Sequence, residues 1–187
     1  MNNNDKFLRL RGEREEQVEQ SNQVMETELR RLMQEHGAYL KRLCFLYLKD
    51  ESLAEDAVSE TFLKLYRALP DFRGESSEKT WISRIAINTC RDFRRAAWYK
   101  LVDLSAALER IQSLQDELSL RDDTVISAVM ALPRKYKEPV LLRYYQNLSL
   151  KEVGEALNLS VSTTSTRLIR ARNMLKNKLK GWYFNEE

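Results

Sequence analysis

Residues 148–172 read LSLKEVGEALNLSVSTTSTRLIRAR and carry the clearest structural signal in the chain. Ser149 and Glu152 have the spacing of a capping box, in which the two side chains satisfy free amide groups at a helix start. A helix is therefore expected to begin at Leu150. Its apolar pattern stops at Leu157, so the helix is short.

A tight turn and a second helix are expected directly after this one. Asn158 is a residue type that adopts the left-handed conformation closing many helices, and Ser160 is placed to cap a new helix. Gly154 costs about 1 kcal/mol in a helix interior, so its presence indicates a close contact between the two helices. Helix, tight turn and helix in this order predict a helix-turn-helix.

The outer face of the second helix carries small hydroxyl side chains followed by arginines. This combination suits entry into the major groove of DNA, where the side chains reach base edges and phosphates. Thr164 falls on the inner face, where its hydroxyl can bond to the carbonyl one turn back. A helical hairpin that packs on another protein is the alternative for this segment. The outward positions, and hence the candidate DNA contacts, are Ser162, Thr163, Ser165, Thr166, Arg167 and Arg170.

The rest of the chain is also expected to be helical. Its 187 residues include only 5 glycines and 3 prolines, and long stretches are rich in the helix formers Leu, Glu, Arg and Lys. No long run alternates polar and apolar residues as a strand would. The sequence predicts an all-α protein of two small helical domains joined by a linker, with the helix-turn-helix in the C-terminal domain. Within that domain, Pro139 is expected to kink a helix or to restart it.

The N-terminal domain shows three helical patterns. Apolar residues at three- and four-residue steps mark one helix over about residues 25–49. Ser52, with Glu55 three residues later, is expected to cap the second helix, which Pro70 ends. A polar loop follows, and a third helix is expected over about residues 81–98.

Charge is unevenly distributed along the chain. Residues 161–181 hold six basic residues and no acidic one, and residues 73–100 hold seven basic and three acidic residues. Between them, residues 103–123 hold six acidic and two basic residues. Two basic segments separated by an acidic one indicate two contacts with a polyanion. An ordinary solvated helix face is the alternative for any single segment.

The sequence offers little for catalysis or for membranes. Cys44 and Cys90 have no metal-ligand spacing and are expected to be reduced thiols. His36, the one histidine, lies on an apolar stripe where a packing role is expected. There is no glycine-rich phosphate loop, cofactor motif or metal cluster, so an enzyme is the weakest interpretation. With neither a signal core nor the ~20 apolar residues of a membrane span, the protein is expected to be soluble and cytoplasmic.

Three stretches in sequence order resemble the extracytoplasmic-function sigma factors, small members of the sigma-70 family that direct bacterial RNA polymerase to promoters. They are AEDAVSETFLKLYRAL (54–69), TWISRIAINTCRDFRR (80–95) and LPRKYKEPVLLRYYQNLSLKEVGEALNLSVSTTSTRLIRARNML (132–175). The resemblance implies that residues 25–98 form sigma domain 2 and residues 122–184 form sigma domain 4, with the acidic segment 99–121 as the linker between them. Residues 1–24 hold few apolar side chains and are expected to be a frayed or partly helical N-terminal extension, which is not typical of the family.

The resemblance also implies a role for each segment. Asp56, Ser59 and Glu60 would dock on the clamp helices of the polymerase's largest subunit, and the polymerase flap would be a further contact. The helix from residue 161 would enter the −35 element. Trp81 is expected to belong to the core. The loop and helix that would hold the −10 element carry Phe72, Arg73, Ser76, Lys79, Asn88, Arg91, Arg94 and Arg95.

This sequence departs from the family pattern at several positions. The docking helix commonly has Gln where Ser59 stands, and the recognition helix commonly has Gly, Val and Lys where Ser162, Thr164 and Ser165 stand. The missing lysine removes a contact, so promoter preference is expected to differ. The family is usually inhibited by an anti-sigma protein, often membrane-anchored, and such a partner is implied here too.

Two other functions fit parts of the sequence. A stand-alone helix-turn-helix regulator would explain residues 148–180 equally well, but not the basic loop and helix of the first domain. A helical adaptor without DNA binding would have to treat both basic segments as solvated faces. Binding to core polymerase, and a salt-dependent affinity for DNA, discriminate among the three.

Overall fold

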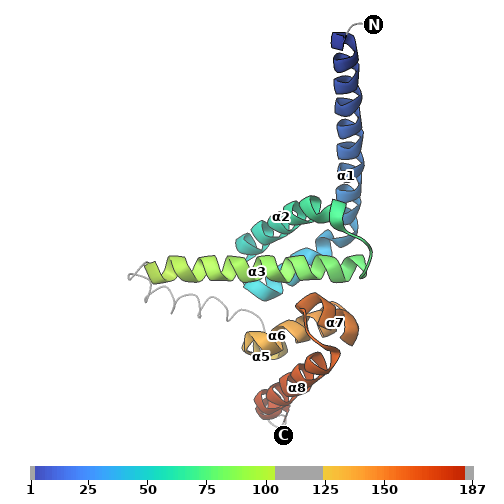
Figure 1. The fold of residues 1–187 in the computed structure, drawn as a ribbon. Coiled ribbons are helices and arrows are strands. Elements are labelled where there is room, and N and C mark those ends of the chain that lie inside the picture. The colour runs from blue at the N-terminus through green and yellow to red at the C-terminus, as the bar shows by residue number, and fades with distance from the viewer. Residues whose placement is uncertain (1–2, 104–123, 184–187) are drawn as a thin grey trace.

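Every element described in the structure is a helix, which confirms the predicted all-α class. The computed structural model describes the backbone of residues 3–103 and 124–183. We call α1–α3 the first domain and α5–α8 the second domain; they lie one above the other in Figure 1. The elements are α1 (Asn3–Leu48), α2 (Glu51–Ala68), η1 (Leu69–Asp71), α3 (Glu78–Asp103), α5 (Thr124–Met130), α6 (Arg134–Val140), η3 (Leu141–Tyr145), α7 (Leu150–Leu157) and α8 (Val161–Tyr183).

The first domain packs α2 and α3 against the C-terminal half of α1. Its core consists of apolar side chains from all three helices, and they follow the stripes expected from the sequence. The most buried are Leu40, Leu43, Leu65, Ile82 and Ile87. The two cysteines, Cys44 and Cys90, lie buried in the same core as free thiols.

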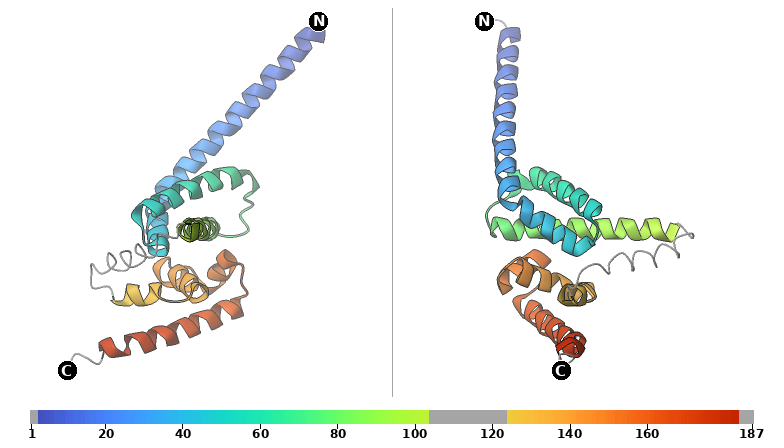
Figure 2. Two further views of the ribbon diagram at one scale, coloured as in Figure 1. Left: turned by 90° about the vertical axis from the view of Figure 1, so that its left-hand side faces the viewer. Right: turned by 180° about the vertical axis from the view of Figure 1, so that it is seen from behind.

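The helix α1 begins earlier than predicted. It runs without a break from Asn3, not from about Met25, and its N-terminal part projects away from both domains (Figures 1 and 2). Residues 9–24 contain Glu, Arg and Gln, which favour helix, and no proline stops the helix there. The sequence predicts a frayed or partly helical extension over residues 1–24, whereas the structure has a continuous helix from Asn3.

The start of α2 corrects a second prediction. Asp50, not Ser52, is the N-cap: its carboxylate accepts a hydrogen bond of 2.8 Å from the amide of Leu53. Lys49 just before it has a φ of 62°, so the chain turns out of α1 there. Aspartate caps helices as well as serine does, and the turn at Lys49 fixes which of the two residues comes first.

The predicted helix-turn-helix is confirmed in α7 and α8. Both hydrogen bonds of the capping box between Ser149 and Glu152 are present, with lengths of 2.8 and 3.3 Å. Asn158 closes α7 in the left-handed conformation, with φ 55° and ψ 52°. Ser160 then accepts a hydrogen bond from the amide of Thr163, which starts α8.

The helix that contains Pro139 changes its hydrogen-bonding pattern, as expected. The α6 helix gives way after Val140 to the π-helical turn η3. A proline has no amide hydrogen to donate, and the wider π turn re-forms the hydrogen bonds beyond it, with the Gln146 amide donating to the Leu141 carbonyl at 3.2 Å.

The third helix and the linker differ from the prediction in one respect. The α3 helix continues to Asp103, past the expected end near Trp98. The predicted linker, residues 99–121, therefore starts inside α3, and its remainder lies outside the described residues. Among the helices that the structure describes, none is long and apolar enough to cross a membrane.

The two domains contact each other. Helix α7 packs on α3, and η3 lies against α1. Glu138 of α6 also accepts hydrogen bonds from Tyr47 of α1 and Arg91 of α3. Both views in Figure 2 place the second domain beside α3. The side of α3 that carries Thr80 and Arg91 therefore faces the second domain.

Candidate functional site

The candidate docking residues lie together on the outside of α2. Asp56 and Ser59 are exposed, and Glu60 is half-buried. Leu63, one turn further along the same face, is 51% exposed. The sequence analysis missed Leu63, although its spacing of seven residues from Asp56 puts it on that face. An exposed apolar side chain among acids suits a partner helix with basic and apolar side chains.

A cleft of about 480 Å³ lies between α2 and α3, next to these residues. Lys64 crosses it, with its ammonium 3.8 Å from a Glu60 oxygen and 3.5 Å from an Asp92 oxygen. One lysine faces three carboxylates, so the cleft keeps a net negative charge. Its lining consists of Leu53, Asp56, Glu60, Lys64, Asp92, Phe93 and Ala96.

A pocket of about 520 Å³, which we call the loop pocket, lies where the loop after η1 meets α3. The Phe72 and Trp81 rings stack there, with centroids 4.4 Å apart and an interplanar angle of 22°. An aromatic wall with basic side chains beside it is the chemistry that holds an unstacked nucleobase. The lining residues are Ala68, Asp71, Phe72, Arg73, Glu75, Ser76, Trp81, Arg84 and Glu155.

The loop pocket brings together some of the predicted residues and adds others. Phe72, Arg73 and Ser76 line it as predicted. Lys79 does not, because its ammonium lies 5.3 Å from the centroid of the Tyr39 ring. Trp81 was assigned to the core, and its half-buried ring does pack there, yet it also forms a pocket wall. Arg84, three residues after Trp81 on the same face, was missed.

The remaining candidate residues of α3 are not equally free. Asn88, Arg94 and Arg95 are exposed. Arg91 is not: its guanidinium donates to both oxygens of Glu138 in the second domain, at 3.0 and 2.6 Å. The side chain of Arg91 is only 25% exposed, so in this arrangement it is paired with a carboxylate and not open to DNA.

The outer face of α8 presents the predicted residues to solvent. Ser162, Thr163, Thr166 and Arg170 are exposed, and Ser165 and Arg167 are half-buried. Thr164 is fully buried, and its hydroxyl donates to the Ser160 carbonyl at 2.9 Å, as predicted. The Arg170 guanidinium lies beside the Tyr136 hydroxyl and holds the pKa of that hydroxyl below its usual value.

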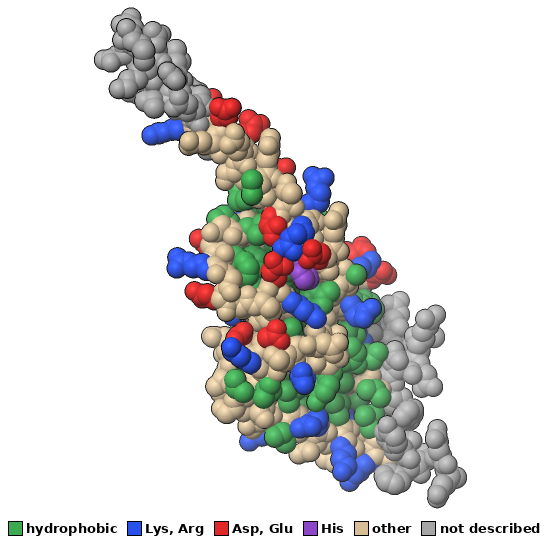
Figure 3. Space-filling view, turned by 90° about the vertical axis from the view of Figure 1, so that its right-hand side faces the viewer, with side chains coloured by type: hydrophobic (Ala, Val, Ile, Leu, Met, Phe, Trp, Pro, Cys, Tyr) green, Lys and Arg blue, Asp and Glu red, His purple; other side chains and the backbone are tan. Residues whose placement is uncertain are grey.

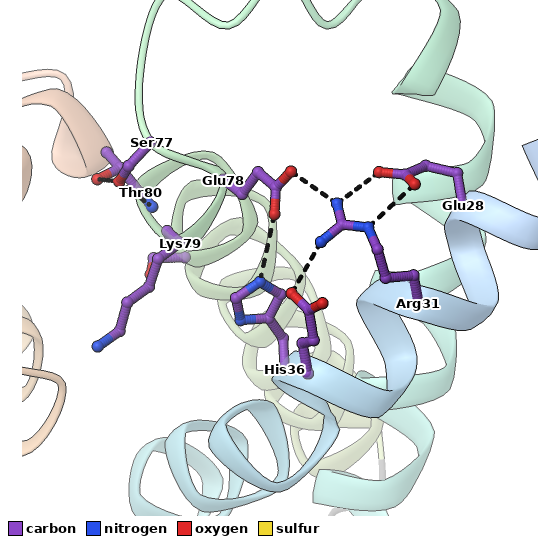
Figure 4. Close-up of polar contacts among 9 residues, drawn as sticks. Glu28, Arg31, His36, Ser77, Glu78, Lys79 and Thr80 are labelled. Carbon is purple, nitrogen blue, oxygen red and sulfur yellow. Dashed lines mark hydrogen bonds and ion pairs between the residues drawn. The ribbon is translucent and has the colours of Figure 1, made fainter.

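An ion cluster joins α1 to the start of α3. Arg31 donates to Glu28, Glu35 and Glu78, and the Glu78 carboxylate also lies 3.7 Å from Nε2 of His36 (Figure 4). In Figure 3, acidic and basic side chains surround this histidine on the surface. Because Glu78 is the first residue of α3, the cluster fixes the end of the loop that leads from the loop pocket.

His36 is half-buried and packs edge-on against Tyr39, with ring centroids 6.2 Å apart. Glu35, His36 and Glu78 are the one group of metal-ligand types that comes together among the described residues. The Arg31 guanidinium already binds both of these carboxylates. The chain's own cation therefore balances them, and the cluster is best explained as a link between helices.

Comparisons with known proteins identify both domains. A family model described as sigma-70 region 2 matches residues 32–99, and one described as sigma-70, region 4 matches residues 122–175. The chain is 34% identical over 136 residues to the RNA polymerase sigma factor SigZ of Bacillus subtilis, covering 72% of this chain and 77% of SigZ. It is 32% identical over 138 residues to the ECF RNA polymerase sigma-E factor of Haemophilus influenzae, covering 66% and 73%.

This chain is an extracytoplasmic-function sigma factor of the sigma-70 family. Solved structures agree. CnrH, solved in complex with the cytosolic domain of CnrY, superposes with a TM-score of 0.63 at 26% identity, over 83% of this sigma factor and 90% of CnrH. The sigma factor RpoE of Bartonella quintana, solved with the anti-sigma factor NepR, has the same fold, with a TM-score of 0.57 at 18% identity over 82% and 97% of the two chains.

Proposed function

We propose that this sigma factor binds core RNA polymerase through α2, holds the −10 element with the loop pocket and α3, and binds the −35 element with α8. The observation that carries the proposal is the coincidence of the family's two regions with two separate domains, each presenting a surface of fitting chemistry. The nucleotide chemistry belongs to the polymerase, so the chain itself is not an enzyme. Its place of action is the cytoplasm, where the polymerase works.

The α2 surface supports the docking assignment. Asp56, Ser59 and Glu60 share one face with the exposed Leu63, and the acidic cleft toward α3 continues that face. The clamp helices of the polymerase's largest subunit would supply the basic and apolar side chains that this surface fits. The helix-turn-helix domain would also contact the polymerase flap.

The loop pocket supports promoter melting. A base that leaves the duplex must be trapped for an opening without ATP to persist. The stacked rings of Phe72 and Trp81 offer a platform, and Arg73 and Arg84 stand beside it to neutralise phosphates. On α3, Asn88 can read a base edge while Arg94 and Arg95 bind the backbone.

The outer face of α8 supports −35 binding. A capped helix N-terminus with hydroxyl side chains, followed by Arg167 and Arg170, suits the major groove. A stand-alone regulator would need only this domain and leaves the match of the first domain to region 2 unexplained. The complex of RpoE with the anti-sigma factor NepR supports an anti-sigma factor as a regulator of this chain. The cytosolic domain of CnrY bound to CnrH supports a membrane-anchored form of that partner.

Two substitutions separate docking from promoter recognition. Asp56→Ala should weaken binding to core polymerase about tenfold and leave the affinity of α8 for its element unchanged, because it removes one charge from the docking face. Arg167→Ala should do the reverse, costing about 1–3 kcal/mol in promoter binding with normal core affinity. Fluorescence anisotropy with core polymerase, and footprinting of the holoenzyme, give the two values.

The matched control substitutions remove charged residues of the same helices, α2 and α8, that lie outside the proposed contact surfaces. Glu51 pairs with Lys41 at 3.8 Å and lies off the docking face, so Glu51→Ala should keep core affinity. Arg172, exposed on α8 outside the predicted set, should tolerate alanine better than Arg167. Normal core affinity for Asp56→Ala, or unchanged promoter affinity for Arg167→Ala, would remove that residue from the proposed site.

A further inference from the structure

Glu138 of the second domain is a buried carboxylate whose hydrogen-bond donors come from the first domain. Its side chain is 3% exposed. The Tyr47 hydroxyl donates to it at 2.7 Å, and the Arg91 guanidinium donates to both of its oxygens. A carboxylate this far from water requires such partners, and a bidentate arginine is the strongest available. The pair therefore exists only while the domains are together.

Glu152 makes a second contact of the same kind. One of its oxygens accepts hydrogen bonds from the hydroxyls of Ser77 and Thr80, at 3.0 and 3.3 Å, at the start of α3. Its other oxygen completes the capping box of α7. Figure 4 shows Ser77 and Thr80 on the side of α3 toward the second domain, away from the Arg31 cluster.

Glu155 brings a third carboxylate to the same face. It lies one turn beyond Glu152 on α7 and lines the loop pocket together with Arg73 and Arg84. Three glutamates of the second domain thus contact the first domain: one binds Arg91, one accepts from two hydroxyls, and one lines the loop pocket. These are the groups to which a single DNA strand would bind if the loop pocket and α3 hold the −10 element.

We propose that Glu138, Glu152 and Glu155 imitate the phosphates of the −10 strand, so that the second domain occupies the DNA-binding face of the first domain in the free protein. Carboxylates and phosphates present the same anionic oxygens to a guanidinium fork, and Arg91 cannot bind both at once. Closure and −10 binding are therefore mutually exclusive. The inference rests on the proposed −10 function of α3.

Closure does not cover the other functional surfaces. Asp56 and Ser59 on α2 remain exposed, and so does the outer face of α8. Polymerase can therefore engage the closed protein, and separation of its two binding sites would then draw the domains apart. The closed arrangement therefore weakens binding to single-stranded DNA but does not prevent binding to polymerase.

The test uses the full chain with the double substitution Glu138→Gln/Glu152→Gln. Glutamine keeps an acceptor for Tyr47, and it also serves in a capping box, so each helix is preserved while both charges are lost. The matched control is Glu19→Gln/Glu26→Gln, which removes two exposed charges from α1 outside the Arg31 cluster. Circular dichroism establishes that all three proteins are equally helical.

Two quantities are measured for each protein: the radius of gyration by small-angle X-ray scattering, and the affinity for a fluorescein-labelled random single-stranded 20-mer. We expect the interface variant to be more extended than the wild type and the control. Its affinity should rise about tenfold, because apparent affinity scales with the fraction of open molecules and the closed form is the major one. The control should bind at most slightly more tightly than the wild type.

The outcomes separate the inference from the function on which it rests. Two results would contradict the proposal that these glutamates take the place of DNA phosphates. One is an unchanged radius of gyration, and the other is a larger radius without a gain in DNA affinity over the control. Transcription with core polymerase is scored in parallel for the wild type and the variant. If neither directs transcription, the proposed function fails; if both do while their radii and DNA affinities agree, the inference alone fails.

Discussion

Gly154 shows how strongly one residue constrains the helix-turn-helix. A Cβ at this position would lie 2.8 Å from the carbonyl oxygen of Leu159 and 3.3 Å from the Thr164 hydroxyl. The first of these atoms is backbone, just past the turn at Asn158, and cannot move without opening that turn. The glycine therefore lets the chain leaving α7 pass closely over the helix.

Gly154→Ala should destabilise the second domain by about 1–3 kcal/mol, the usual cost of forcing an extra methyl group into a packed site. Gly37 on α1 is the matched control, since nothing lies within 4 Å of its added Cβ. Gly37→Ala should instead stabilise the protein, by about 0.5–1 kcal/mol, through helix propensity. Urea unfolding followed by circular dichroism measures both; a stabilised Gly154→Ala would show that the contact with Leu159 is not tight.

At the residue scale, the sequence predicts local contacts well and distant ones not at all. The roles of Ser149, Asn158 and Thr164 follow from neighbours within four residues, and all three are confirmed. The prediction of the α2 N-cap was wrong because Asp50 and Ser52 are both residue types that cap helices well. The pairing of Arg91 with Glu138, 47 positions apart, has no local signature.

The burial of Lys137 also depends on a residue that is distant in the sequence, Tyr47. Lys137 is 5% exposed, and its ammonium lies 5.0 Å from the Tyr47 ring centroid. Burial, with Arg94 nearby, lowers the pKa of Lys137 to about 8. Residues 134–138 contain three basic side chains and one acidic one, and this composition gives no sign that Lys137 and Glu138 are buried.

At the scale of elements, the helices follow from periodicity wherever they bury a face. The cores of α2, α3, α7 and α8 lie where the apolar stripes predict. The projecting part of α1, expected to be frayed or partly helical, is a continuous helix from Asn3, and α3 runs past its predicted end. Phe72, Arg73 and Ser76, which line the loop pocket, were candidate −10 contacts from the family resemblance, whereas Trp81 was assigned to the core.

Phe72→Ala tests the loop pocket as an element. Loss of one stacking ring should weaken binding of holoenzyme to promoter DNA with a pre-melted −10 segment by about tenfold, within the range of about 1–3 kcal/mol per stacked base. Phe45, an aromatic residue of α1 that is 44% exposed and outside the pocket, is the control. Equal affinities for Phe72→Ala and Phe45→Ala would show that the pocket holds no base.

At the scale of the whole molecule, the two domains are joined by hydrogen bonds to buried or partly buried carboxylates. The sequence predicted both domains and the acidic segment between them, but not how the domains sit. Their interface depends on single side chains, Glu138 and Glu152, whose partners lie far away in the sequence. The closed arrangement and the promoter-bound one must therefore exchange, and polymerase binding is the event proposed to drive that exchange.

The most direct test of the central claim is transcription in vitro with core RNA polymerase and fragmented genomic DNA from the source organism, with and without this protein. The account predicts new, discrete transcript starts that share two upstream elements at a fixed spacing, as expected for a holoenzyme binding through both domains. Absence of such starts, from a protein that still shifts duplex DNA by itself, would contradict it and favour a stand-alone helix-turn-helix regulator.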